Sequence, residues 1–141
     1  MSADLMQDIG GLIALWQPRK TYHIGPNYLG DLKKFLQDQM KPASFFAGRR
    51  VALEFVDGKS MDIGVKRKTG AQLETVGVVM KRDLATLEDL RVLMEQVNRA
   101  EKEYQGHYVI LMGTLTSEME DKLRAFIANK GPGAKITIVK K

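Results

Sequence analysis

The spacing of apolar side chains changes from helical to strand-like near residue 49, and this change limits the fold more than any other feature. Before it, apolar residues repeat every three or four positions over 4–16 and 27–40. After it, they alternate with polar residues in three segments that turn signals separate: 49–56, 60–67 and 73–81. Alternation over short segments joined by tight turns predicts a three-stranded antiparallel meander.

The rest of the chain predicts a parallel unit. An amphipathic helix is expected over 84–104, and the nearly continuous apolar segment 107–113 is typical of a strand buried on both faces. A helix that begins near Ser117 and a last strand over 135–139 follow. A strand, helix and strand in this order predict a parallel pair. The expected fold class is α/β with a mixed sheet: an antiparallel meander plus a parallel strand-helix-strand unit, with helices on both faces.

The length of 141 residues fits a single domain, 1–141. Within it we expect an N-terminal helical extension over 1–20 and the main core over 27–141. The absence of cysteine excludes disulfides and thiolate sites. No apolar segment is long enough for a bilayer and no signal peptide is evident, so the expectation is a cytoplasmic protein with no membrane partner.

The formal net charge of +5 is unevenly distributed along the chain. Residues 1–40 are neutral, 41–82 carry +5, 83–121 carry −6 and 122–141 carry +6. Basic clusters such as Arg49-Arg50 and Lys66-Arg67-Lys68 favour a polyanion as partner. An ordinary solvated surface is the competing interpretation.

Matching the apolar faces of the first two strands gives a hairpin register. Leu53 is expected opposite Ile63, which places Glu54 opposite Asp62 and leaves a three-residue loop, 57–59. Lys66 and Lys81 then share a face with both carboxylates. Two carboxylates and a lysine on adjacent strands suggest a divalent-cation site, whereas a cross-strand charge array on a solvated face is the plainer alternative.

A helix, a three-stranded meander and then a helix and strand resemble the core of the restriction-endonuclease-like superfamily, the PD-(D/E)xK nucleases. The resemblance covers roughly residues 27–113. Met61-Asp62-Ile63-Gly64 occupies the place of the family's Asp motif, and Val79-Met80-Lys81-Arg82 occupies the place of Glu-x-Lys. Asp31 matches the acidic residue of the preceding helix, and Gln96 resembles a supporting polar position. The chain departs from the pattern at Val79, which cannot ligate a metal.

The resemblance implies a domain that binds nucleic acid, DNA above all. It also implies metal-dependent phosphodiester cleavage, a hydrolase activity that uses Mg²⁺. Catalysis would then fall to Asp62 and Lys81, with the metal held by Asp62, Glu54 and Asp31. The residues expected to contact phosphate are basic: Arg49, Arg50, Lys66, Arg67, Lys68 and Arg82.

Two explanations of Val79 stay open. Either another carboxylate, from Glu54, Asp31 or Glu95, has replaced the missing glutamate, or the chain is a degenerate nuclease. In the second case it acts as an interaction or assembly module, through its N-terminal helix or the acidic segment 83–121. A homodimer is expected from the resemblance alone. His107 begins an apolar segment, where a buried histidine with satisfied hydrogen bonds is expected.

Overall fold

The computed structural model describes residues 4–21, 25–40, 45–46, 49–57 and 62–141. Its helices are α1 (Leu5–Leu15), α2 (Gly25–Gln39), α3 (Leu87–Glu103) and α4 (Ser117–Ala128). Its strands are β1 (Phe45–Phe46), β2 (Arg49–Asp57), β3 (Asp62–Thr69), β4 (Gln72–Leu84), β5 (Gly106–Leu115) and β6 (Ile136–Lys140). Among the described residues, none of the helices is both long and apolar enough to cross a bilayer.

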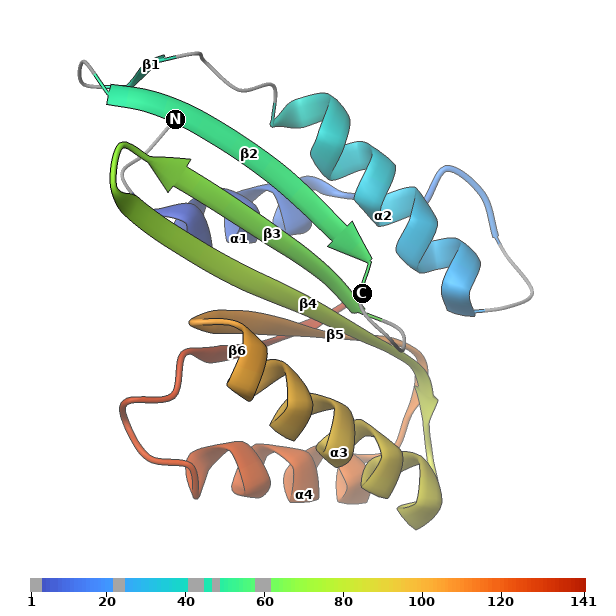
Figure 1. Cartoon of the computed structure of the whole chain (residues 1–141). Coiled ribbons are helices and arrows are strands. Elements are labelled where there is room, and N and C mark those ends of the chain that lie inside the picture. Colours follow the sequence, from blue (N-terminus) through green and yellow to red (C-terminus); the bar gives the residue numbers. More distant parts are fainter. Residues whose placement is uncertain (1–3, 22–24, 41–44, 47–48, 58–61) are drawn as a thin grey trace.

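The strands form one mixed sheet in chain order, from β1 to β6 (Figure 1). Neighbouring strands from β1 to β4 are antiparallel, and the β4–β5 and β5–β6 pairs are parallel. The predicted α/β class, with an antiparallel meander joined to a parallel unit, is therefore confirmed. The two-residue strand β1, which pairs with the start of β2, was not expected.

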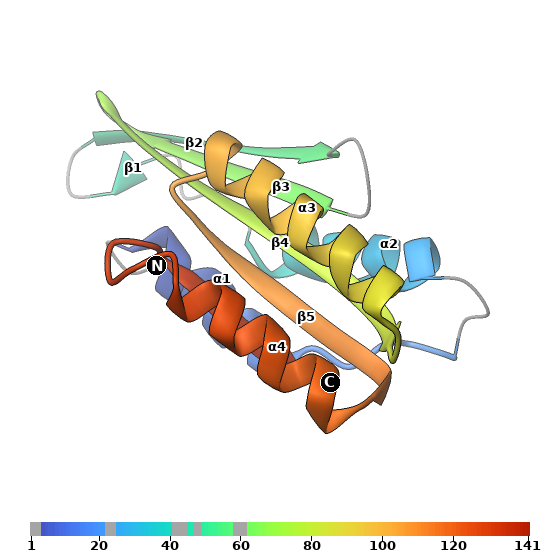
Figure 2. The same cartoon turned by 90° about the horizontal axis from the view of Figure 1, so that it is seen from below.

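Strand β4 carries both layers of the core. Val78 and Met80 pack with α1 and α2 in one apolar cluster, while Val79 packs with α3 and α4 in the other. Figure 2 shows α3 and α4 on the near face and α1 and α2 behind. Alternation along β4 thus explains why helices cover both faces.

Helix α1 is part of the core and not an extension. Its apolar side chains are fully buried against the sheet: Leu5, Ile9, Ile13 and Trp16. The Tyr108 hydroxyl of β5 donates a 2.6 Å hydrogen bond to the Met6 carbonyl of α1. This corrects the expected boundary at residue 20, and it shows that the apolar face of this helix is occupied by the core.

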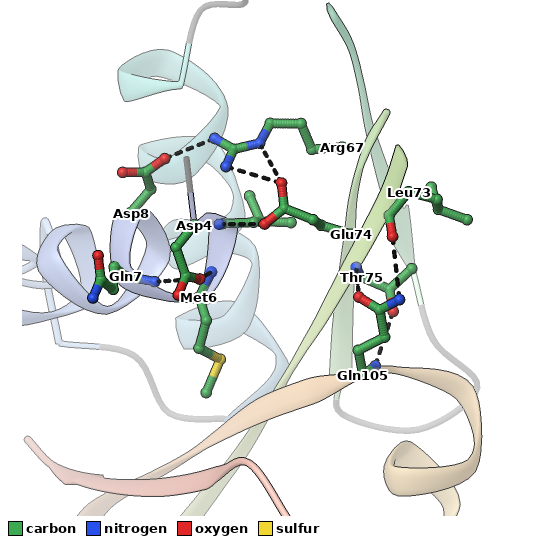
Figure 3. Close-up of polar contacts among 10 residues, drawn as sticks. Asp4, Met6, Gln7, Asp8, Arg67, Leu73, Glu74, Thr75 and Gln105 are labelled. Atoms are coloured by element: carbon green, nitrogen blue, oxygen red, sulfur yellow. Dashed lines mark hydrogen bonds and ion pairs between the residues drawn. The ribbon is translucent and has the colours of Figure 1, made fainter. Parts of the chain in front are cut away.

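A buried arginine ties α1 to the meander (Figure 3). Arg67 of β3 is only 3% exposed, and its guanidinium lies 2.7 Å from Asp8 of α1 and 3.1 Å from Glu74 of β4. The other Glu74 oxygen accepts the Leu5 N–H at 2.7 Å. Because a buried guanidinium is costly without paired carboxylates, these contacts hold the start of α1 in place.

The first hairpin has a different register from the one expected. Leu53 stands opposite Arg67, not Ile63, and Glu54 stands opposite Lys66, not Asp62. The shift is an even number of residues, so every side chain keeps its face. The apolar pattern alone does not distinguish such registers. Gly58 and Lys59 of the expected three-residue loop lie outside the described residues.

The neighbouring glycines of α1 allow a matched test of this packing. A Cβ on Gly10 would overlap the Tyr108 hydroxyl, whereas a Cβ on Gly11 meets nothing. Gly10→Ala is expected to destabilise the protein by about 1–2 kcal/mol, since overpacking outweighs the gain in helix propensity. Gly11→Ala is expected to stabilise it by about 0.5–1 kcal/mol. Urea unfolding of both variants measures the difference, and equal effects would contradict the packing described.

Candidate functional site

The strand register places Asp62 and Lys81 on the same face of the sheet. Asp62 stands opposite Val79, and Lys81 follows two residues later on β4. Positions related in this way are diagonal neighbours, with Cα atoms roughly 7–8 Å apart. The side chain of Asp62 lies outside the described part of the structure, so its position rests on the backbone alone.

Lys81 has a carboxylate partner that the sequence interpretation missed. Its Nζ lies 3.5 Å from Asp89 in the first turn of α3. Hydrogen bonding from the Thr86 hydroxyl, aided by the charge of Lys81, lowers the pKa of Asp89. Thr86 is the N-cap of α3 and accepts the Asp89 N–H. The Thr-x-x-Asp spacing just after a strand was the available signal, because a capping pair returns its acidic side chain towards the strand end.

The other two predicted metal ligands lie elsewhere. Glu54 is level with Lys66, four residues along β3 from Asp62, which corresponds to about 13 Å. Asp31 is buried on α2, across the sheet from Lys81, where it accepts hydrogen bonds from Trp16 Nε1 at 3.1 Å and Arg19 N at 2.9 Å. Asp31 therefore holds the segment after α1, and the expectation that it joins Asp62 and Glu54 is wrong.

An aromatic ring covers β3 between the positions of Asp62 and Lys66. Gly64 and Gly77 are paired on β3 and β4, and Tyr104 lies against both. A Cβ on Gly77 would come within 2.5 Å of the Tyr104 ring. Val79, in the place of the expected glutamate, is fully buried under α3. The glycines thus leave room for Tyr104 and not for a ligand.

The described candidates Glu54 and Asp31 do not converge on one point. Among the described side chains, which do not include that of Asp62, no three Asp, Glu, His or Cys residues gather closely enough to hold a metal. The carboxylate nearest Lys81 is already engaged by Lys81 and Thr86. Mg²⁺ needs several oxygen ligands in octahedral geometry, and this arrangement offers too few.

Two of the predicted phosphate contacts are engaged inside the fold. Arg67 is buried between Asp8 and Glu74, so the prediction that it contacts phosphate is wrong. Arg82 lies over the Tyr28 ring, 5.5 Å from its centroid, about 23 Å along β4 from the position paired with Lys66.

The predicted supporting residue Gln96 lies on α3. Its side chain is 8% exposed and faces inward with the other buried residues of that helix.

One end of the sheet, on the left in Figure 1, carries several lysines. There β3 ends, β4, β5 and β6 begin, and α3 finishes. Gln105 ties these elements together, because its side chain bonds the backbone of Thr75 and Leu73 (Figure 3). Lys66, Lys68, Lys102 and Lys135 have no ion-pair or hydrogen-bond partner among the described residues. Arg49 and Arg50 begin β2 at the same end, although their side chains lie outside the description. We call these residues the basic end: Arg49, Arg50, Lys66, Lys68, Lys102 and Lys135.

A cavity lies beside the basic end, and Lys135 is part of its lining. It has a volume of about 400 Å³ and lies between the last turn of α3, the start of β5 and the segment that leads into β6. The residues that line it include Glu101, Tyr104, His107, Lys130 and Lys135. Lys130 bridges Glu101 at 2.9 Å and Asn98 at 2.6 Å, so those two opposite charges offset each other.

His107 on the cavity wall is unsatisfied. It is 1% exposed, and its Nε2 is the one buried side-chain nitrogen or oxygen atom in the described part of the chain with no hydrogen-bond partner. Burial, aided by the charge of Lys130 and opposed by Glu101, lowers the pKa of His107 to about 4. The expectation of a satisfied histidine is therefore wrong, and the sequence carried no signal for this.

Known proteins give no further guide. No protein-family model matches the sequence, and a search of curated proteins finds no significant match.

Titration of His107 tests its burial. The free pKa of histidine is about 6.5, so the unfolded chain takes up a proton that the folded chain refuses until about pH 4. We expect the free energy of unfolding to fall from pH 6.5 to pH 4 and the effect to saturate below that. NMR of the imidazole gives the midpoint directly, and His107→Gln should lose this part of the pH dependence. A midpoint near 6.5 would contradict the buried, unpaired imidazole.

Proposed function

We propose that this chain is a nucleic-acid-binding domain that contacts the phosphate backbone of DNA through the basic end. The supporting observation is the grouping of lysines without partners. Elsewhere in the described chain most basic side chains have partners, such as Arg91 with Glu88 and Glu95, or Arg124 with Glu120. Charges that the fold does not use internally are the ones a polyanion can neutralise.

The span of the basic end suits a backbone contact. From Lys66 on β3 to Lys135 beside β6 is three strand spacings, or about 14 Å. Glu54, opposite Lys66, and Glu103, beside Lys102, carry the opposing charges there. Among the described side chains, four lysines against these two carboxylates leave a net positive charge, and backbone contacts of this kind position a nucleic acid without reading its sequence.

Protein binding through the N-terminal helix has less support. The apolar face of α1 lies in the core, and exposed Leu15 is an isolated residue on its surface. Scattered apolar residues of this kind are normal on monomers. Phosphodiester cleavage also has less support, because Glu54 and Asp31 do not accompany Asp62 and because Asp89 is engaged.

DNA binding should be strongly salt-dependent. Fluorescence anisotropy with a short labelled duplex should show tight binding at low salt, with the logarithm of affinity falling linearly with the logarithm of salt concentration. The double variant Lys66→Gln and Lys68→Gln should reduce the slope by about 2, since each phosphate contact contributes about 1. Lys122→Gln on α4, an exposed lysine outside the basic end, is the matched control and should leave the slope unchanged.

Absence of binding at low salt, or equal effects of the control and the double variant, would refute this assignment. Tighter binding to an RNA duplex of the same sequence would change the proposed substrate from DNA to RNA.

Metal-dependent cleavage is tested with the same duplex. With Mg²⁺ or Mn²⁺ we expect no cleavage by the wild type above that of Asp62→Asn, because the described carboxylates do not converge. Gel analysis over a time course is the measurement. Cleavage by the wild type that Asp62→Asn abolishes would establish a nuclease and would overturn the interpretation of Asp31, Glu54 and Asp89 given above.

A further inference from the structure

We propose that the basic end selects single-stranded DNA, which lies across an open part of the sheet beside α3. Five described side chains form this open face: Ala52, Glu54, Lys66, Lys68 and Leu73. The inference rests on the proposed nucleic-acid binding, and it names the class of nucleic acid that this end of the sheet recognises.

The first argument is that the helices leave this face open. Val79 of β4 packs under α3, so alternation places Leu73 on the same side of the sheet. Lys68 stands opposite Leu73 and Ala52 stands opposite Lys68, which gives one row across three strands. The apolar cluster under α3 and α4 takes its described strand residues from β4, β5 and β6. Outside that cover, Ala52 and Lys68 are exposed and Leu73 is 51% exposed.

The second argument is the apolar side chain at the end of this row. The Gln105 side chain donates to the Leu73 carbonyl at 3.1 Å and accepts the Thr75 N–H at 3.2 Å, so it fixes the backbone that carries Leu73 (Figure 3). Leu73 is thus held beside Lys68, one of the lysines without a partner in the described chain. A fixed apolar group next to a cation matches the two parts of a nucleotide, because the base face is apolar and the phosphate is anionic.

The third argument decides between a duplex and a single strand. A duplex keeps its base faces stacked inside and presents its phosphates outside, so it offers nothing to an apolar side chain on a flat sheet. An unstacked base can lie against Leu73, and the small Ala52 side chain lets the strand approach β2 closely. Lys66 and Lys68 lie about 7 Å apart along β3, a separation that lets them contact successive phosphates of one strand. A surface that used charge alone would instead prefer a duplex, whose phosphates are denser.

The surroundings orient the strand. The Tyr104 ring covers β3 at Gly64, so the open face ends there. Glu54 stands opposite Lys66 and disfavours phosphate over β2. The phosphates therefore lie over β3, and the bases turn towards Leu73 on β4.

The class of nucleic acid is tested by fluorescence anisotropy with two labelled probes of the same length. One is oligothymidine, a single-stranded DNA that forms no duplex with itself, and the other is a DNA duplex. At one salt concentration the wild type should bind the single strand about tenfold more tightly, because only the single strand offers an unstacked base.

Two variants test the open face itself. Leu73→Ala should lower the affinity for oligothymidine about fivefold, the effect of a lost apolar contact, and leave duplex binding unchanged. Its matched control is Leu87→Ala at the start of α3, where a leucine that is 63% exposed lies outside the basic end. Ala52→Glu places a carboxylate beside Lys68 and should weaken single-strand binding about tenfold. Ala125→Glu, at an exposed position on α4, should leave binding unchanged.

The failures are distinguishable. Equal affinity for the two probes, or tighter binding of the duplex, would overturn the single-strand assignment and leave backbone contact through the basic end intact. Equal effects of Leu73→Ala and Leu87→Ala would overturn the open face as the binding surface. Binding of neither probe at low salt would overturn the proposed function itself.

Discussion

The architecture depends on burial of β4 on both faces. This strand is antiparallel to β3 and parallel to β5, so it joins the meander to the parallel unit. Val78 and Met80 anchor α1 and α2, while Val79 anchors α3. A polar side chain in the middle of β4 would have to be buried in one layer or the other, at considerable cost. A buried apolar residue such as Val79 is therefore what a strand covered by α3 requires.

Packing on the α3 face also determines how much room the meander leaves for a ligand. Gly64 and Gly77 let the Tyr104 ring lie directly against the backbone of β3 and β4. Tyr104 is the C-cap of α3, so the helix ends with this ring against the sheet. The side chain of Gln105, the next residue, accepts the backbone N–H of Thr75 near the start of β4. The same closure brings Lys102 and His107 to the end where Lys66 and Lys68 stand. The place where α3 ends thus determines where the basic end and the cavity lie.

Periodicity predicted the class of fold because side-chain alternation follows directly from strand and helix geometry. It assigned Leu53 and Phe55 to the correct face but not to the correct partners, since registers that differ by an even number of residues bury the same side chains. Long-range polar pairing left no local pattern. Arg67 looked like part of a surface cluster because its neighbours Lys66 and Lys68 are charged, yet alternation turns it inward to Asp8 and Glu74.

Two of the buried polar residues, Arg67 and His107, differ in how the fold uses them. Arg67 is buried with carboxylates on two elements, and its contacts account for its presence as a structural tie. His107 is equally buried, but its Nε2 contributes no bond to the described structure. A side chain that serves only packing would be more favourable as an apolar residue of similar size, because it would avoid the desolvation cost. Burial of His107 therefore costs the fold stability that no contact among the described residues offsets.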